Sequence, residues 1–225
     1  MATTAPPRAP QQVKAAPQPL RWYRDRKRLG TAAVVLLALA AVVAWFVITS
    51  GRRKEDFAAR MLSQAVATAD RGNLPQAASD LQRLIQTYRG TEAAGEAVLL
   101  LNQIRLTTGQ AELAAGNLRE FLASQPPPRY AAPAASLLGA ALESGNKFAE
   151  AAQAYERAAG LADLDYMRAA YLLEAGRAFR EAGRTQDAIR VYRNIVEKYP
   201  SAPAVPEAQL RLAELTAGAA GAGAR

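Results

Sequence analysis

Four alanines recur at a fixed interval, and this period constrains the fold more than any other feature of the sequence. Ala77, Ala114, Ala151 and Ala188 lie 37 residues apart. Each follows a turn made of a glycine and a polar residue: Gly72-Asn73, Gly109-Gln110, Gly145-Asn146 and Gly183-Arg184. A small residue at a fixed period is typical of stacked helical hairpins, because only a small side chain lets two helices approach closely. The spacing therefore predicts a solenoid, which is an extended surface for binding.

The amino-acid composition excludes most kinds of catalytic site. The 225-residue chain contains no cysteine and no histidine, although 50% of its residues are hydrophobic. This excludes thiol nucleophiles, disulfides, the usual general base and nearly every zinc or haem ligand set. The acid pairs Glu92/Glu96 and Glu143/Glu150 are expected on solvated helix faces. We therefore expect a protein that is not an enzyme and that needs no cofactor or metal.

The net charge of +8 is concentrated at the N-terminus. Residues 1–30 carry seven Lys and Arg against one acid, whereas the charges of the later residues are nearly balanced. Nucleic-acid binding needs a basic stripe on the folded part, so no nucleic acid is expected as a partner. Proline-rich and polar composition predicts a disordered cytoplasmic tail over 1–28. An Ala/Gly-rich stretch predicts a second disordered tail over 217–225.

A long uncharged stretch predicts a transmembrane helix over 29–51. A helix over 31–49 would span roughly 28 Å at about 1.5 Å per residue, close to the thickness of the hydrocarbon core of a lipid bilayer. Trp22 and Trp45 suit the two membrane interfaces. The excess of Lys and Arg is larger on the N-terminal side, so residues 1–28 are expected in the cytoplasm and the repeats outside it. We interpret the segment as an uncleaved anchor in the inner membrane, because no good cleavage site follows it.

Residues 52–216 are expected to hold about four helical hairpins and a cap helix. With units starting at Ala58, Gly95, Ala132 and Ala169, bulky and small residues recur in phase. In the first helix, unit three has Leu138-Gly139 with Leu142, and unit four has Leu172, Gly176 and Phe179. In the second helices of the four units, in order, the pairs are Leu81/Leu84, Leu118/Phe121, Tyr155/Ala158 and Tyr192/Ile195. This pattern resembles the tetratricopeptide repeat (TPR). It implies an all-α, TPR-like α-solenoid preceded by one transmembrane helix, with the aromatic residues packed inside the repeats.

The resemblance also implies a concave face lined by fixed positions of the first helices. The candidate protein-binding groove consists of Leu62, Val66, Leu99, Gln103, Leu106, Leu173, Arg177 and Arg180. These residues predict an apolar channel with a basic end, suited to an extended or amphipathic peptide. The alternative is that the leucines pack against neighbouring units.

The order of a basic tail, one helix near residue 40 and an Ala-rich TPR domain resembles the ancillary subunit of the bacterial Sec translocon. That resemblance implies an inner-membrane protein whose periplasmic repeats chaperone exported proteins. The implied partners are translocon subunits, exported chains or envelope-assembly proteins. A structural tether or assembly factor in cell division, outer-membrane or cytochrome biogenesis is the alternative, and the oligomeric state is left open.

Overall fold

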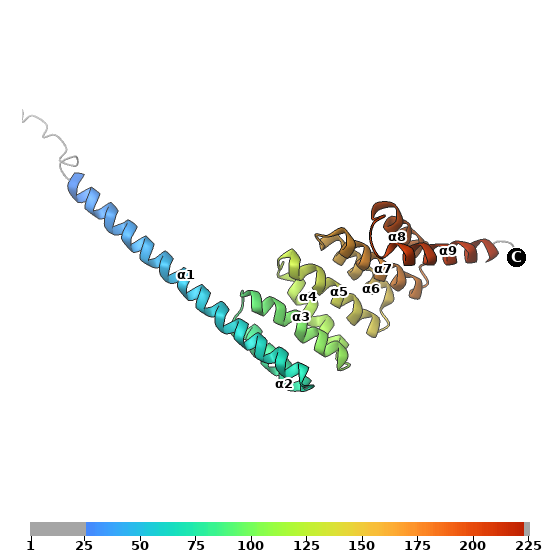
Figure 1. The fold of residues 1–225 in the computed structure, drawn as a ribbon, viewed down its shortest axis with the longest axis horizontal. Coiled ribbons are helices and arrows are strands. Elements are labelled where there is room, and N and C mark those ends of the chain that lie inside the picture. Colours follow the sequence, from blue (N-terminus) through green and yellow to red (C-terminus); the bar gives the residue numbers. More distant parts are fainter. Residues whose placement is uncertain (1–25, 223–225) are drawn as a thin grey trace, which may run out of the picture. The chain divides into compact units, whose positions relative to one another are not determined.

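The described part of the chain is helical throughout. The computed structural model describes the backbone of residues 26–222 and the side chains of residues 33–45 and 49–217. Within this range the helices are α1 (Arg26–Asp70), α2 (Leu74–Thr87), α3 (Glu92–Thr107), α4 (Ala111–Ala123), α5 (Pro128–Ser144), α6 (Phe148–Leu161), α7 (Asp165–Glu181), α8 (Thr185–Lys198) and α9 (Val205–Ala222) (Figure 1). The predicted all-α class is confirmed. The chain divides between Ser50 and Gly51 into two units.

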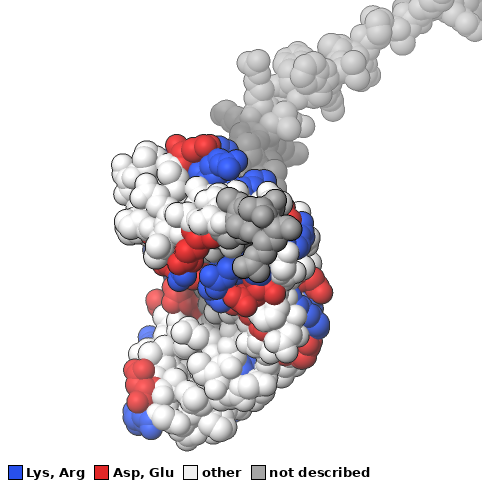
Figure 2. All heavy atoms as spheres, turned by 90° about the vertical axis from the view of Figure 1, so that its right-hand side faces the viewer, with Lys and Arg blue, Asp and Glu red and all other residues white. Residues whose placement is uncertain are grey.

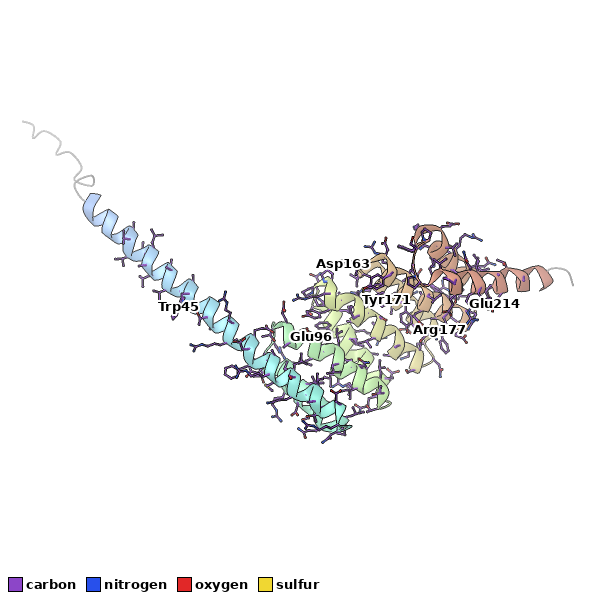
Figure 3. All side chains as sticks on the ribbon, viewed as in Figure 1. Trp45, Glu96, Asp163, Tyr171, Arg177 and Glu214 are labelled. Carbon is purple, nitrogen blue, oxygen red and sulfur yellow. The ribbon has the colours of Figure 1, made fainter. Side chains whose placement is uncertain are left out.

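The first unit contains the apolar part of α1. Its large side chains are exposed: Val34, Leu37 and Trp45 are 65%, 71% and 67% accessible. Trp45 is labelled in Figure 3. By length and hydropathy, α1 is the helix of the described chain that is long and apolar enough to cross a membrane. The predicted transmembrane helix ends at residue 51, whereas α1 continues without interruption to Asp70. Most of the predicted tail over 1–28 lies outside the described residues.

The second unit is an array of four hairpins. Residues 51–70 of α1 pair with α2 through a core that includes Ala65, Leu81 and Leu84. The other hairpins are α3–α4, α5–α6 and α7–α8, and α9 packs against α8. The four periodic alanines are all fully buried near the start of the second helix of each hairpin. The repeat array expected from the 37-residue period is therefore confirmed.

The turns within the hairpins share one geometry. Gly72, Gly109, Asn146 and Gly183 have φ values of 83°, 77°, 57° and 73°, which is the left-handed region. In each turn the next residue donates its N–H to a carbonyl five residues earlier, as Arg184 does to Phe179 at 2.9 Å. This is the Schellman ending of a helix. In the third turn, predicted as Gly145-Asn146, the left-handed position is held by Asn146, because asparagine tolerates that conformation better than most residues.

In three of the hairpins, a small residue on the first helix lies opposite a large residue on the second helix. A Cβ added to Gly139 or Gly176 would lie 2.7 or 2.5 Å from the ring of Tyr155 or Tyr192. Each ring comes from the second helix of the same hairpin, and both rings are buried. In the first hairpin Ala65 and Leu81 occupy the corresponding places and are fully buried. These contacts explain why the first helices carry a small residue near the middle.

The last helix is longer than the expected cap. It runs from Val205 to Ala222 and therefore covers residues 217–222 of the stretch predicted as a disordered tail. The alanines of this stretch have a high intrinsic helix propensity, which favours continuation of the helix. Residues 223–225 lie outside the described part.

Candidate protein-binding site

The predicted groove residues lie on α1, α3 and α7, the first helices of three hairpins. Val66 is 38% exposed and Gln103 is exposed. The four leucines are mostly buried. Leu62 packs against a buried cluster formed by α1, α2 and α3, and Leu99, Leu106 and Leu173 pack against a second cluster formed by α4 to α9. The interpretation that the leucines pack against neighbouring elements therefore explains most of their surface. The remainder faces solvent and is the part that could contact a partner.

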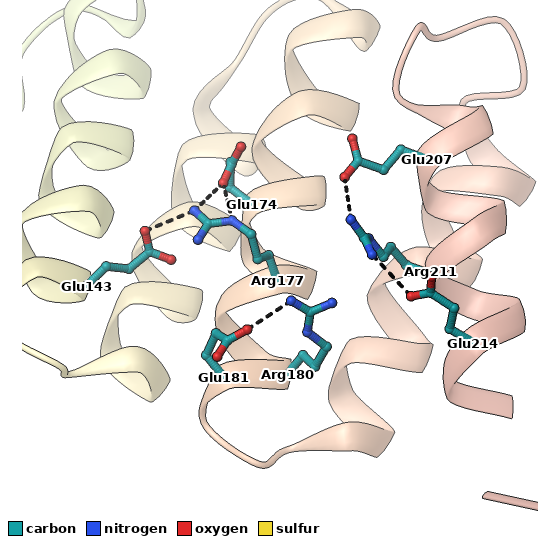
Figure 4. Close-up of polar contacts among 8 residues, drawn as sticks. All are labelled: Glu143, Glu174, Arg177, Arg180, Glu181, Glu207, Arg211 and Glu214. Atoms are coloured by element: carbon teal, nitrogen blue, oxygen red, sulfur yellow. Dashed lines mark hydrogen bonds and ion pairs between the residues drawn. The ribbon is translucent and has the colours of Figure 1, made fainter. Parts of the chain in front are cut away.

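The predicted basic end of this groove is occupied by ion pairs. Arg177 Nη2 lies 2.5 Å from Glu174 Oε2 and 3.0 Å from Glu143 Oε2, while Arg180 lies 2.9 Å from Glu181 (Figure 4). On α9, Arg211 pairs with Glu207 and Glu214 at 3.6 and 3.2 Å. Both arginines predicted for the basic end are therefore paired with acidic residues. Of these acids, Glu143 reaches α7 from another helix, α5, through the stacking of the hairpins.

Glu143 has a structural place in this network. Its Oε2 accepts a hydrogen bond from the Tyr155 hydroxyl at 3.2 Å as well as the bond from Arg177. Burial, with the nearby Glu143 carboxylate, raises the pKa of Tyr155 well above its usual value, so the hydroxyl stays a donor. Glu150, suggested as a partner of Glu143 in an acid pair, instead pairs with Arg119 at 3.3 Å. Among the described side chains, no group of three or more acidic residues is placed to hold a metal ion.

The charges of the repeat unit are mixed on the surface. On the face seen in Figure 2, acidic and basic side chains alternate, and large areas carry neither. Several pairs connect neighbouring hairpins, including Lys147 with Glu112 at 2.9 Å and Arg190 with Glu156 at 2.9 Å. This face therefore lacks the continuous basic stripe that nucleic-acid binding requires.

A cavity of about 610 Å³, not predicted from the sequence, lies at the second hairpin. Its walls come from the second half of α2, one face of α3, α4 and the start of α5. Much of the lining is apolar, and these side chains include Ile85, Val98, Leu101, Phe121 and Tyr130. The volume falls in the range of about 300–1,000 Å³ that is common for ligand sites.

Two buried polar side chains line this cavity, and both come from α3. Asn102 and Arg105 are 1% and 7% exposed. The Asn102 amide donates to the Val98 carbonyl at 2.8 Å, and its oxygen accepts from Arg105 Nη1 at 3.4 Å. Burial lowers the pKa of Arg105, because a buried guanidinium loses solvation of its charge. Within residues 33–45 and 49–217, no carboxylate oxygen lies within 4.0 Å of a nitrogen of this guanidinium.

A polar break in the repeat could have identified this site from the sequence. Asn102 lies 37 residues before Gly139 and 37 after Ala65, so it occupies the small-residue position of the second unit. Arg105 likewise corresponds to Leu142 and Phe179. Two polar residues at positions that are small or apolar in the following units mark the second hairpin as exceptional.

A sequence model described as tetratricopeptide repeat matches residues 137–203 and 173–222, which cover most of the last two hairpins and α9. A comparison with curated proteins found no match. Two solved structures of a putative kinesin light chain with nearly identical TPR-like repeats, from Podosopora anserina, share the fold. Both are 18% identical to this chain and cover 69% of it and 83% of their own length, with TM-scores of 0.57 and 0.56. At that identity the likeness concerns the fold alone, and it agrees with the matched repeats: the chain is a TPR-repeat protein.

Proposed function

We propose that this chain is a membrane-anchored TPR scaffold that binds other proteins on the extracytoplasmic side. The repeat array supports protein–protein interaction as its activity. The observation that carries the proposal is the combination of this array with an apolar segment whose large side chains are exposed on α1. The basic residues before that segment favour a cytoplasmic N-terminus.

The partners proposed are exported polypeptides, and the chain acts as a chaperone-like accessory of protein export. Partly exposed leucines on α1, α3 and α7 offer apolar contacts without a strict pattern, which suits segments of varied sequence. The anchor raises the local concentration of the repeats at the membrane, where such chains emerge. The absence of histidine and cysteine from the sequence supports binding rather than catalysis, with no cofactor.

The test is site-specific photocrosslinking in cells from positions 62, 99 and 173, with position 113 as a matched control. Leu113 is 52% exposed on α4, a second helix, and therefore reports on non-specific contacts. Crosslinks from the three first-helix positions to many exported polypeptides and to translocon subunits would support the proposal. One dominant envelope protein would favour the structural tether instead. Equal crosslinking from position 113 would contradict binding by the first-helix face.

The orientation requires its own measurement. Protease added to cells whose outer barrier has been opened should degrade the repeats and leave the N-terminal tail intact. Repeats that become accessible only after the inner membrane is dissolved would contradict the proposed orientation. A chain that remains soluble after the membranes are pelleted would contradict the anchor.

A further inference from the structure

The cavity of the second hairpin has a polarity that the fold itself does not require. Where α3 carries Arg105, the later hairpins have Leu142 and Phe179, which are 4% and 1% exposed. Where α3 carries Asn102, they have Gly139 and Gly176. The third and fourth hairpins thus pack with apolar and small residues at these two positions, so the fold does not require polar residues there. Local departures from a consistent pattern are expected at functional sites.

The buried guanidinium of Arg105 lacks the partner that such a group normally has. Buried charges are usually paired, because the loss of their solvation is unfavourable when nothing compensates it. Its hydrogen-bonding partner among the described side chains is a neutral amide oxygen at 3.4 Å. That distance is long compared with the roughly 2.7–2.9 Å of a charge-assisted bond. A carboxylate supplied from outside would provide the missing interaction and could bind in the bidentate manner that guanidinium favours.

The rim of the cavity is charged but leaves Arg105 uncompensated. Glu92 pairs with Arg129 at 2.6 Å, so these two charges offset one another. Arg89 and Glu120 are exposed and also line the cavity, and they are opposite in sign. The positive charge of Arg105 therefore remains as the excess inside the cavity.

We propose that this cavity binds a segment of a partner protein, which places an acidic side chain against Arg105 and an apolar side chain against Phe121 and Tyr130. The inference rests on the proposed protein-binding function but uses a different surface from the first-helix groove. Arg105 is almost completely buried, so a ligand must reach inward. An aspartate or glutamate side chain extends beyond its backbone and can do this from the mouth of the cavity, whereas a chain terminus would have to bring its backbone inside.

The test uses the full-length chain in nanodiscs and a panel of short, fluorescein-labelled synthetic peptides. Each peptide is amidated at its C-terminus and has one central glutamate next to leucine, phenylalanine or tryptophan. A matched panel replaces the glutamate with glutamine. Fluorescence anisotropy should show glutamate peptides that bind at least about tenfold more tightly than their glutamine counterparts, the ratio expected for losing one charge-assisted hydrogen bond.

Three variants assign this preference to the cavity. Arg105→Leu copies Leu142 of the third hairpin, so we expect it to fold, as checked by circular dichroism, and to lose the glutamate preference. Arg105→Lys keeps the charge but not the planar fork and should retain part of the preference. Arg157→Leu, at an exposed position on α6, is the control and should keep the full preference.

Several results would overturn the proposal. These are the absence of any glutamate-dependent binding in the panel, or a preference that survives in Arg105→Leu. Tighter binding of a peptide with a free C-terminus than of its amidated form would place a chain end, not a side chain, at Arg105 and would equally contradict it. If first-helix crosslinks to exported chains persist while these results are obtained, only this inference fails and the scaffold function stands.

Discussion

The hairpins α3–α4 and α7–α8 share the same period and the same kind of turn, but their interiors differ. In α7–α8, Gly176 receives the ring of Tyr192 and Phe179 is 1% exposed. In α3–α4, the corresponding places on α3 hold Asn102 and Arg105, and a cavity of about 610 Å³ lies beside them. A repeat array tolerates this because each hairpin contacts mainly its neighbours, so one of them can open without disturbing the rest.

The hydrophobic core is also divided at the second hairpin, between α3 and α4. One buried cluster contains residues of α1, α2 and α3, and the other contains residues of α4 to α9. α3 also packs less closely against α4 than α5 does against α6. We infer that the second hairpin has a lower local stability than the third and fourth, which is the usual property of segments that bind and adapt.

The largest change in stability should come from placing an arginine in the third hairpin, at the position that corresponds to Arg105. Leu142→Arg places an arginine where the third hairpin has a leucine that is 4% exposed. We expect a loss of about 3–5 kcal/mol in the free energy of unfolding, because the charge would be buried without a partner. Urea unfolding followed by circular dichroism measures it, with Leu142→Met as the control that keeps the volume. A loss below about 1 kcal/mol would mean that the third hairpin opens as readily as the second.

Filling the small-residue position tests how tightly a closed hairpin is packed. Gly176→Ala brings a methyl group to within 2.5 Å of the Tyr192 ring and should cost about 1–3 kcal/mol through overpacking. Gly116→Ala on α4 is the matched control. Its Cβ would meet nothing within 4 Å, so a gain of about 0.5–1 kcal/mol is expected from helix propensity. The same response in both variants would refute the close contact of α7 and α8.

The turns should respond according to the residue at the left-handed position. Gly183→Ala forces alanine into a φ of 73° and should cost about 1–2 kcal/mol. Asn146→Gly, at the equivalent place in the third turn, should change stability by less than about 0.5 kcal/mol, since relief of strain is offset by the entropy of glycine. Melting temperatures of the two variants are sufficient to compare them. A large gain from Asn146→Gly would show that this turn is strained.

The last predicted effect is a gain in the stability of the second hairpin. Arg105→Leu removes a buried charge and should raise the stability of the repeats by about 1 kcal/mol, even as it removes the proposed peptide binding. Thermal unfolding of the full-length chain in nanodiscs measures this change, and the exposed Arg157→Leu is again the control. A substantial loss of stability would show that the buried charge of Arg105 makes a stabilising interaction beyond its hydrogen bond to Asn102.

The sequence predicted the repeats but not the chemistry between them. The 37-residue period of Ala77 and its equivalents was sufficient to place four hairpins, because a small residue at a fixed period is typical of closely packed, stacked helices. The turns were predicted, but not which residue of each adopts the left-handed conformation; in the third turn it is Asn146 and not Gly145. The pairing of Arg177 with Glu143 depends on how α5 stacks beside α7, which no local pattern in the sequence reveals.

The cavity illustrates a different limit. Asn102 and Arg105 were visible as departures from the repeat, but their burial depends on how α2, α4 and α5 surround α3. A polar residue on a helix is normally expected to face solvent, so its inward position required the structure.

Native-state hydrogen exchange of the full-length chain in nanodiscs tests the contrast between the hairpins most directly. Peptides from α3–α4 and from α5–α6 should be compared in the unmodified chain and in Arg105→Leu. We predict faster exchange in the backbone amides of α3–α4, and slower exchange there once Arg105 is replaced. Equal protection of the two hairpins, unchanged by the substitution, would contradict the claim that polar residues keep the second hairpin open.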